Sequence, residues 1–174
     1  MTVAIDEAAI VLGSARGDGN TRTAIDLVFG GPPVHCVDLS QFHISTYDYS
    51  HVNSGDAFVP LIESLLVKPL WVLATPVYWY TMSAPMKVFL DRVSDLITVR
   101  KDLGRQLRVK SIAVVACGID PELPEGFEAP FKMTCNYLGM HYLGAFYLPF
   151  GDDDKPSAAK LAAAREWGAS LIAP

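Results

Sequence analysis

The segment that decides the fold runs Ala8-Ala9-Ile10-Val11-Leu12-Gly13-Ser14-Ala15-Arg16-Gly17-Asp18-Gly19-Asn20-Thr21. Its apolar first part, closed by a cluster of glycines and small polar residues, predicts a buried strand that ends in a loop. The helical spacing of apolar residues over 21–29, with Asn20 or Thr21 as the N-cap, predicts a helix directly afterwards. Because backbone N–H groups and the positive end of the helix dipole meet in such a loop, it predicts an anion site.

The side chains of this loop favour a phosphate as the anion. Ser14, Asn20 and Thr21 supply further donors, and Arg16 adds a full charge on a planar fork. The alternative is an ordinary polar turn between strand and helix, but such turns usually have about two to six residues. The loop at 13–21 is longer and carries an arginine. It therefore favours a pocket for a phosphorylated cofactor.

Three common phosphate loops are excluded by the residues present. No Gly-Lys-Ser/Thr ends the loop, as a P-loop requires. Gly17-Asp18-Gly19 begins like the dinucleotide fingerprint, but Arg22 stands where its third glycine should be. A Cys-x5-Arg phosphatase loop is excluded because the segment has no cysteine. The loop suits a single terminal phosphate, as on a mononucleotide.

Length and composition predict one domain and restrict its partners. The 174 residues are 51% hydrophobic, enough for one sizeable core. No apolar run is long enough to span a bilayer, and the N-terminal residues carry no secretory pattern. The net charge of −5 with scattered Lys and Arg argues against nucleic acid as a partner. Cys36, Cys117 and Cys135 are odd in number and widely spaced, so we expect reduced thiols in a cytoplasmic protein and no metal site.

Strand and helix patterns alternate along the whole chain. Beyond the first unit, apolar runs predict strands at 34–39, 70–74, 112–116 and 141–148. Helical spacing predicts helices at 57–67, 84–97, 127–139 and 158–172, and 40–55 is expected to be a long loop. The acidic cluster at 152–154 is expected to be a solvated turn. This alternation predicts a parallel sheet covered on both faces, hence an α/β fold.

Ligands of such sheets bind beyond the carboxyl ends of the strands, where three predicted loops meet: 13–21, 75–83 and 117–126. The second loop carries Tyr78, Trp79 and Tyr80 and suits a flat ring. In the third, Gly118 would let the backbone approach that ring. The aromatic residues alone would fit a protein contact equally well, but a phosphate loop on the same edge favours a cofactor. A phosphate at one end and a flat heterocycle at the other describe flavin mononucleotide (FMN).

At these residues the chain resembles the NAD(P)H-dependent FMN reductase family, which is flavodoxin-like in fold. The resemblance covers about 8–120, and Asp56 also fits the family spacing. The matching motifs are Gly13-Ser14-x-Arg16-x-x-Gly19-Asn20-Thr21, Thr75-Pro76-Val77-Tyr78 and Ser83-x-Pro85-Met86-Lys87-x-Phe89-Leu90-Asp91-Arg92. The resemblance implies that 1–174 is a single FMN-binding domain, a three-layer sandwich with a five-stranded parallel sheet in the order 2-1-3-4-5.

The resemblance also implies the roles of particular residues. The FMN phosphate would be held by Ser14, Arg16, Asn20 and Thr21 around Gly19, and the ring would lie against Pro76, Val77, Tyr78 and Trp79 with Gly118 near its far edge. Backbone N–H groups of 76–79 would stabilise charge on the reduced ring. NADPH or NADH would donate a hydride, and a quinone, free flavin or azo compound would accept it. We expect no catalytic side chain, because the flavin carries the chemistry.

Two relatives of this family differ from the chain in ways that matter. Iron–sulfur flavoproteins share both motifs but carry a compact cysteine cluster, and 40–57 contains no cysteine. A cluster needs about four thiolates, so we expect none here. A flavodoxin-type electron carrier remains the alternative function; the arginine in the phosphate loop and the modest acidity of the chain disfavour it. A non-catalytic partner-binding or sensor module is the weakest alternative.

The roles of several charged residues and histidines are not decided by the sequence. Lys87 and Asp91 are spaced for an ion pair on one helix face, although the resemblance implies that this helix, which includes Arg92, forms a homodimer; a homotetramer is left open. His43, His51 and His141 lack partners at ligand spacing. A site for a 2′-phosphate or a solvated basic turn would each explain the cluster Arg100, Lys101 and Arg105.

Overall fold

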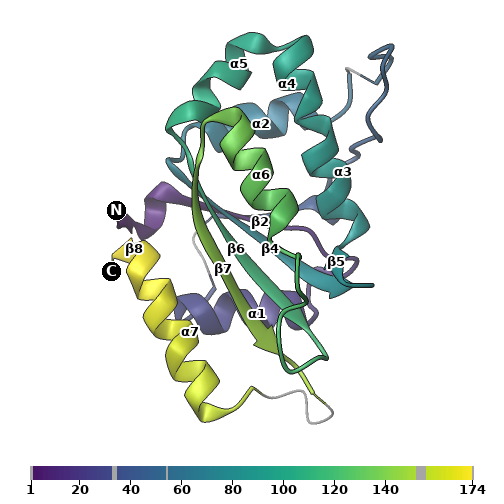
Figure 1. Ribbon diagram of the computed structural model, residues 1–174. Helices are drawn as coiled ribbons and strands as arrows, with labels where there is room; N and C mark the ends of the chain where they lie inside the picture. Colours follow the sequence, from purple (N-terminus) through teal and green to yellow (C-terminus); the bar gives the residue numbers. More distant parts are fainter. Residues whose placement is uncertain (1, 33–34, 54, 152–155, 174) are drawn as a thin grey trace.

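The computed structural model describes residues 2–32, 35–53, 55–151 and 156–173. A parallel sheet forms its centre (Figure 1), with strands in the order β3, β2, β4, β6, β7. Their bounds are Cys36–Asp38 for β3, Ala8–Leu12 for β2, Leu70–Tyr78 for β4, Ser111–Gly118 for β6 and His141–Pro149 for β7. In chain order this is 2-1-3-4-5, so the predicted flavodoxin-like sheet is confirmed.

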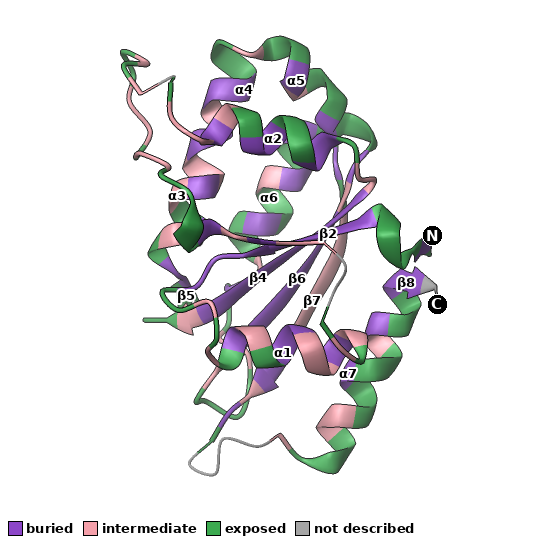
Figure 2. Cartoon of the chain, turned by 180° about the vertical axis from the view of Figure 1, so that it is seen from behind, coloured by how far each residue is buried: buried purple, intermediate pink, exposed green. Residues whose placement is uncertain are grey.

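Helices cover both faces of the sheet. One face carries α1 (Asn20–Phe29) and α7 (Ala158–Leu171). The other carries α2 (Phe58–Leu66), α3 (Ala84–Arg92), α4 (Ser94–Thr98), α5 (Lys101–Gln106) and α6 (Ala129–Leu138). Figure 2 shows the buried strands between helices whose outer sides are exposed. Short 3-10 turns lie at Ile5–Glu7, Leu39–Gln41 and Leu107–Val109.

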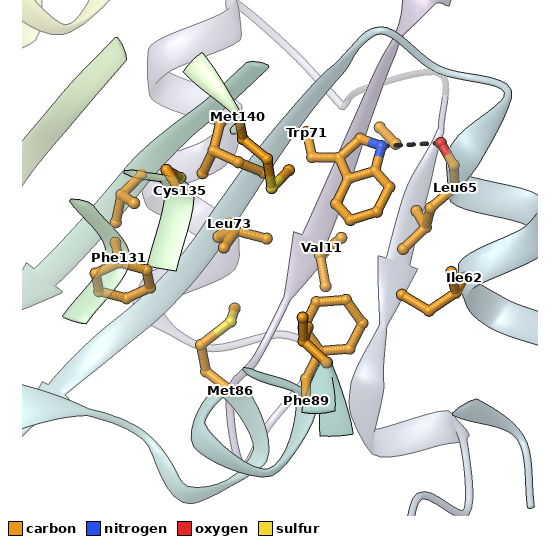
Figure 3. Close-up of a cluster of buried hydrophobic side chains, with 14 of the residues drawn as sticks. Val11, Ile62, Leu65, Trp71, Leu73, Met86, Phe89, Phe131, Cys135 and Met140 are labelled. Atoms are coloured by element: carbon orange, nitrogen blue, oxygen red, sulfur yellow. Dashed lines mark hydrogen bonds between the residues drawn. The ribbon is translucent and has the colours of Figure 1, made fainter. Parts of the chain in front are cut away.

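The strands divide the core into two apolar layers. All five residues of β2 are buried, and because side chains alternate along a strand, Val11 joins the layer under α2–α6 while Ile10 and Leu12 join the layer under α1 and α7. In the first layer Trp71 packs beside Leu73 and Phe89, and its Nε1 donates to the Leu65 carbonyl over 2.8 Å (Figure 3). The continuous apolar runs of the sequence are therefore strands buried on both faces.

Three expectations about local structure are wrong. The segment 75–83 is a β-hairpin rather than a loop: β4 runs to Tyr78 and pairs antiparallel with β5 (Thr81–Met82). The expected helix 84–97 is two helices, α3 and α4, divided at Val93. Ile172, expected to end the last helix, begins β8 (Ile172–Ala173), which pairs with β1 (Val3–Ala4) in a separate two-stranded sheet.

Three further segments differ from the prediction or fall outside the described residues. α5 was not predicted; it packs on α4 so closely that a Cβ at Gly104 would lie 2.1 Å from the Leu96 carbonyl oxygen. The strand predicted at 34–39 is observed as β3 over Cys36–Asp38, Leu39 begins a 3-10 turn, and Val34 lies outside the described residues. The acidic cluster at 152–154 also lies outside them.

Candidate functional site

A hollow of about 330 Å³ lies at the carboxyl edge of the sheet, beyond β2, β4 and β6. Strand order reverses between β2 and β4, and ligands of doubly wound sheets bind beside that reversal. The volume is within the usual range of about 300–1,000 Å³ for small-molecule sites. The hollow is lined by Ser14, Arg16, Gly19, Asn20, Thr21, Pro76, Val77, Tyr78, Cys117, Gly118 and Ile119. Nine of the ten predicted site residues therefore lie around one space.

The phosphate loop ends where α1 begins. Gly19 is the N-cap in an extended conformation, and its carbonyl accepts from the N–H groups of Arg22 and Thr23. The N–H groups of a first helical turn have no carbonyl partner inside the helix, so this end attracts an anion. The Arg16 guanidinium lies beside Gly19: a Cβ there would be 3.6 Å from both Nε and Nη2.

Arg16 is exposed, and its guanidinium makes no hydrogen bond or ion pair with any other residue that the structure describes. In contrast, the guanidinium of Arg22 pairs with Asp26 one turn further along the same helix, at 3.1 Å. A free guanidinium next to a helix N-terminus is a donor set suited to a phosphate.

Ser83 ties the phosphate loop to the start of α3. Its hydroxyl donates to the Gly13 carbonyl over 2.5 Å, and its backbone N–H donates to Thr75 Oγ1 over 3.0 Å. The same hydroxyl also accepts from the N–H of Met86 as the N-cap of α3. A Cβ at Gly13 would lie 2.8 Å from the Met86 side chain. The sequence motif around Ser83 therefore positions the loop and does not itself line the hollow.

On the other side of the hollow, bare backbone lies between β4 and β6. The described pairing of these strands ends at Pro76 and Cys117, so the β6-facing edge of Val77 borders the hollow. Opposite it, a Cβ at Gly118 would lie 2.9 Å from Tyr147 Oη and 3.3 Å from Val77 Cβ. A side chain at this position would displace Tyr147 or Val77, so glycine lets bare backbone border the hollow here.

Tyr147 fixes the loop that follows Gly118. The side chain is buried, and its hydroxyl donates to the Asp120 carbonyl over 2.7 Å. Burial, together with the nearby Asp120 and Cys117, raises the pKa of Tyr147 to about 12. The phenol therefore stays protonated, and hence a donor, throughout the neutral range.

Two lining residues were missed by the sequence, and one predicted residue does not line the hollow. Cys117 is buried at the end of β6 with Sγ 3.3 Å from Thr21 Oγ1. Burial raises its pKa to about 11, so it stays a thiol at neutral pH. Ile119 lies at the rim and is exposed. Both residues are next to Gly118 in the sequence, and that adjacency was the signal that could have identified them.

Trp79, at the hairpin tip, is 90% exposed and does not line the hollow.

Arg92 is fully buried, and its hydrogen bonds hold the long 40–55 loop in place. Its Nη1 donates to Asp56 Oδ2 and to the Ser45 carbonyl, and its Nε donates to Asp95 Oδ2 over 2.8 Å. On the loop, His51 Nδ1 lies 3.1 Å from Asp95 Oδ1. Of the three charged residues left open on this helix, Arg92 therefore belongs to the interior, whereas Lys87 and Asp91 form the expected surface ion pair at 2.5 Å.

Hydrogen bonds also decide the ionisation of this cluster. Burial by itself would raise the pKa of Asp56, but bonds from Arg92 and from the N–H groups of Phe58 and Ser45 outweigh it and hold that pKa below its ordinary value. Burial would likewise lower the pKa of Arg92, and its bonds with Asp56 and Asp95 raise it instead. Asp56 and Arg92 are therefore both charged at neutral pH.

The basic cluster considered for a 2′-phosphate does not lie at the hollow. Arg100 Nη2 is bound by Glu63 Oε1 at 3.1 Å and Asp102 Oδ2 at 2.9 Å. Lys101 and Arg105 belong to α5, at the opposite end of the sheet from the β4–β5 hairpin (Figure 1). Among the described residues no group of three His, Cys, Asp or Glu is arranged to hold a metal. None of the helices described there is long and apolar enough to cross a membrane.

The sequence profile of the NADPH-dependent FMN reductases matches residues 7–155. The chain belongs to this family. Bacillus subtilis YwqN is described as a putative NAD(P)H-dependent FMN-containing oxidoreductase. It is 28% identical to this chain over an alignment 146 residues long, which covers 78% of this chain and 81% of that protein. The chain is thus an oxidoreductase of the NADPH-dependent FMN reductase type.

Solved structures support the same fold. The Trp repressor binding protein from Bacillus subtilis superposes with a TM-score of 0.72 and 25% identity over 92% of this chain and 96% of that one. An NADPH-quinone reductase from P. pentosaceus superposes with a TM-score of 0.67 over 100% of this chain and 99% of that one, at 16% identity. The second likeness concerns the fold alone.

Proposed function

We propose that the carboxyl-edge hollow binds FMN with its phosphate on the 13–21 loop and its ring against Pro76, Val77, Tyr78 and Gly118. The observation that carries this proposal is the free guanidinium of Arg16 at the N-terminus of α1, in the same hollow as the bare backbone of Gly118. Ser14 and Thr21, both buried, and Asn20 add polar groups at the phosphate end. A phosphate donor set and a flat glycine surface fit the two ends of this cofactor.

Backbone dipoles, rather than acids or bases, tune the site. Bound FMN supplies the two-electron chemistry by which a hydride from NADPH or NADH reaches an acceptor. The edge of Val77 and Tyr78 beyond the end of the β4–β6 pairing presents backbone groups to the ring. Such fixed dipoles stabilise charge where it develops, at no reorganisation cost. We assign no catalytic side chain, and Cys117, a buried thiol with a raised pKa, stays protonated beside Thr21.

A small planar molecule is the acceptor that best fits the rim. Tyr78 and Ile119 are exposed on either side of the hollow and offer apolar surface to such a molecule. We propose a quinone, a free flavin or an azo compound.

The proposal extends to a homodimer in the cytoplasm. Trp79 and Tyr80 are exposed at the tip of the hairpin beside the hollow, and Lys87 and Asp91 lie nearby on α3. We propose that a second copy covers this apolar tip and completes the entrance. Cys36, Cys117 and Cys135 are free thiols, which suits a reducing compartment. Light scattering of the purified chain tests the dimer; a monomer at all concentrations would contradict it.

The test of the function is a visible spectrum of the purified protein, followed by NADPH and then NADH under nitrogen. We expect flavin bands that bleach with at least one of the two nicotinamides and return on addition of a quinone. Bands that persist with both donors would indicate an electron carrier. A colourless protein that does not bind added FMN would refute the cofactor site itself.

Gly118→Ala tests where the ring binds. Its Cβ would enter the flat surface between Val77 and Tyr147, so we expect weaker FMN binding. Gly55→Ala is the control, because a Cβ there meets no atom within 4 Å. Equal FMN affinity in the two variants would place the ring elsewhere.

A further inference from the structure

A second and larger hollow, of about 490 Å³, lies at the other end of the sheet. Figure 1 shows α4, α5 and the end of α6 gathered there, away from the β4–β5 hairpin. The residues that line it are Leu96, Ile97, Lys101, Gly104, Arg105, Arg108, Asn136, Tyr137, Leu138 and Gly139. Strand β6, which connects the two ends, has eight residues, and at about 3.3 Å per residue it separates the two hollows by roughly 23 Å.

Three cations of this hollow lie on one helical face. Lys101, Arg105 and Arg108 are spaced by four and three residues along α5 and the 3-10 turn that follows it. Like charges at this spacing repel one another and destabilise a helix. None of the described residues that line the hollow is acidic, although the chain carries 19 Asp and Glu in total. The arrangement is therefore unfavourable until an anion enters.

The described residues also offer these cations no partner. The side chains of Lys101, Arg105 and Arg108 make no hydrogen bond or ion pair with any residue in the described part of the chain. Their neighbour Arg100 does the opposite, since it holds Glu63 and Asp102. Asp102 is the acidic residue nearest to Lys101 in the sequence, and its carboxylate is bound to Arg100. It is therefore not available to neutralise the positive charge of the hollow.

The opposite wall offers an aromatic ring and an amide. Tyr137 is 76% exposed although it lines the hollow, and Asn136 lies beside it on the last turn of α6. An exposed ring can stack on a nucleobase and so contribute to its binding. An amide side chain carries both a donor and an acceptor for the edge of a base.

We propose that this hollow binds a nucleoside diphosphate, with the phosphates on Lys101, Arg105 and Arg108 and the base on Tyr137. Guanidinium groups bind phosphate through paired hydrogen bonds. The hollow is large enough for a nucleotide. Its distance from the carboxyl edge separates it from the space where a nicotinamide would meet the flavin in the same chain.

Calorimetric titration of the whole chain, with FMN present in excess, tests this site with ADP, pyrophosphate and adenosine as probes. We expect saturable binding of ADP that is tighter than that of pyrophosphate and weakens with added salt, and no binding of adenosine alone. ADP binding that is absent or not saturable would overturn the proposal. Pyrophosphate binding as tight as that of ADP would overturn the base contact.

Substitutions test whether ADP binds in this hollow. Arg105→Ala/Arg108→Ala should weaken ADP binding at least about tenfold, since a hydrogen bond to a charged group is worth more than 1.4 kcal/mol. Tyr137→Ala should weaken ADP and leave pyrophosphate unchanged. The matched control is Lys132→Ala, an exposed lysine of α6 that lines neither hollow. All these side chains are exposed, so circular dichroism should be unchanged. Equal ADP affinity in the double variant and the control would refute the site, whether or not the chain reduces a flavin.

Discussion

Two arginines, one in the loop before α1 and one at the end of α3, are held in contrasting ways. Arg16, in the loop after β2, is exposed, and its guanidinium has no partner in the described part of the chain. Arg92, at the end of α3, is fully buried and pairs with Asp56, Asp95 and the Ser45 carbonyl. A buried charge is costly unless an opposite charge lies beside it, whereas an exposed one stays hydrated at little cost. The first arginine is therefore available to a ligand, and the second belongs to the architecture.

The comparison also explains what holds the long 40–55 loop. Ser45 lies early in that loop, and Asp56 comes just after it. Both accept hydrogen bonds from the guanidinium of Arg92, which belongs to α3. Asp56 Oδ2 also accepts from the Ser45 N–H over 2.8 Å. The loop is thus fixed at both ends by one side chain, and between these ends Tyr49 stays exposed.

The largest effect should come from Arg92→Met. It keeps the volume but leaves Asp56 and Asp95 buried without their cation, which costs about 3–5 kcal/mol of the free energy of unfolding. Urea denaturation measures this. Because the penalty comes from uncompensated charge, Arg92→Met/Asp56→Asn/Asp95→Asn should recover much of it. Unchanged stability in the single variant would show that the pairing is not structural.

Acid should loosen the same cluster. The pKa of Asp56 is lower in the folded protein than its unfolded value of 3.8, so its contribution to stability is complete above about pH 5. That contribution is lost as the pH falls through the lower, folded pKa. Urea midpoints measured across this range should fall more steeply for the wild-type chain than for Asp56→Asn. Parallel pH profiles would contradict the assignment.

Arg16→Ala should leave folding intact and weaken the cofactor. We expect a stability change within about 0.5 kcal/mol, as for other exposed positions. FMN affinity should fall about 10- to 100-fold, because hydrogen bonds to a charged group are worth about 1.5–3 kcal/mol. Fluorescence titration of FMN measures it, and Arg16→Lys should restore only part, since lysine lacks the planar fork. An unchanged Kd for FMN would show that Arg16 does not bind the phosphate.

The smallest effect concerns the hairpin tip. Trp79 and Tyr80 have φ of 48° and 67°, in the left-handed region that favours Asn and Gly in two-residue hairpins. In the monomeric chain, Trp79→Asn/Tyr80→Gly should therefore raise the free energy of unfolding by about 1 kcal/mol. Trp79→Ala is the control, because it removes the ring and keeps the unfavourable backbone. A gain in both variants would attribute the effect to the exposed ring instead.

Much of the fold was predictable because its signals are local. The continuous apolar runs around Val11, Val72 and Val114 indicated strands buried on both faces, and each is a central strand of the sheet. The phosphate loop was predictable for the same reason: glycines, small polar residues and a helix start follow one another within 13–21. The hairpin was missed because aromatic residues occupy a turn that normally carries Asn-Gly.

By itself, then, the sequence determined the order of the main strands and helices, the loop between β2 and α1, and nine of the residues that border one hollow. Tertiary structure alone decided which charges are paired. Arg92 meets Asp56 across 36 residues, and Cys117 meets Thr21 across 96. Among the described residues it also left Arg16, and the three cations of α5 and the turn after it, without partners. Local patterns depend on neighbours in the chain, but the burial and pairing of a charge depend on residues that only the folded sheet brings together.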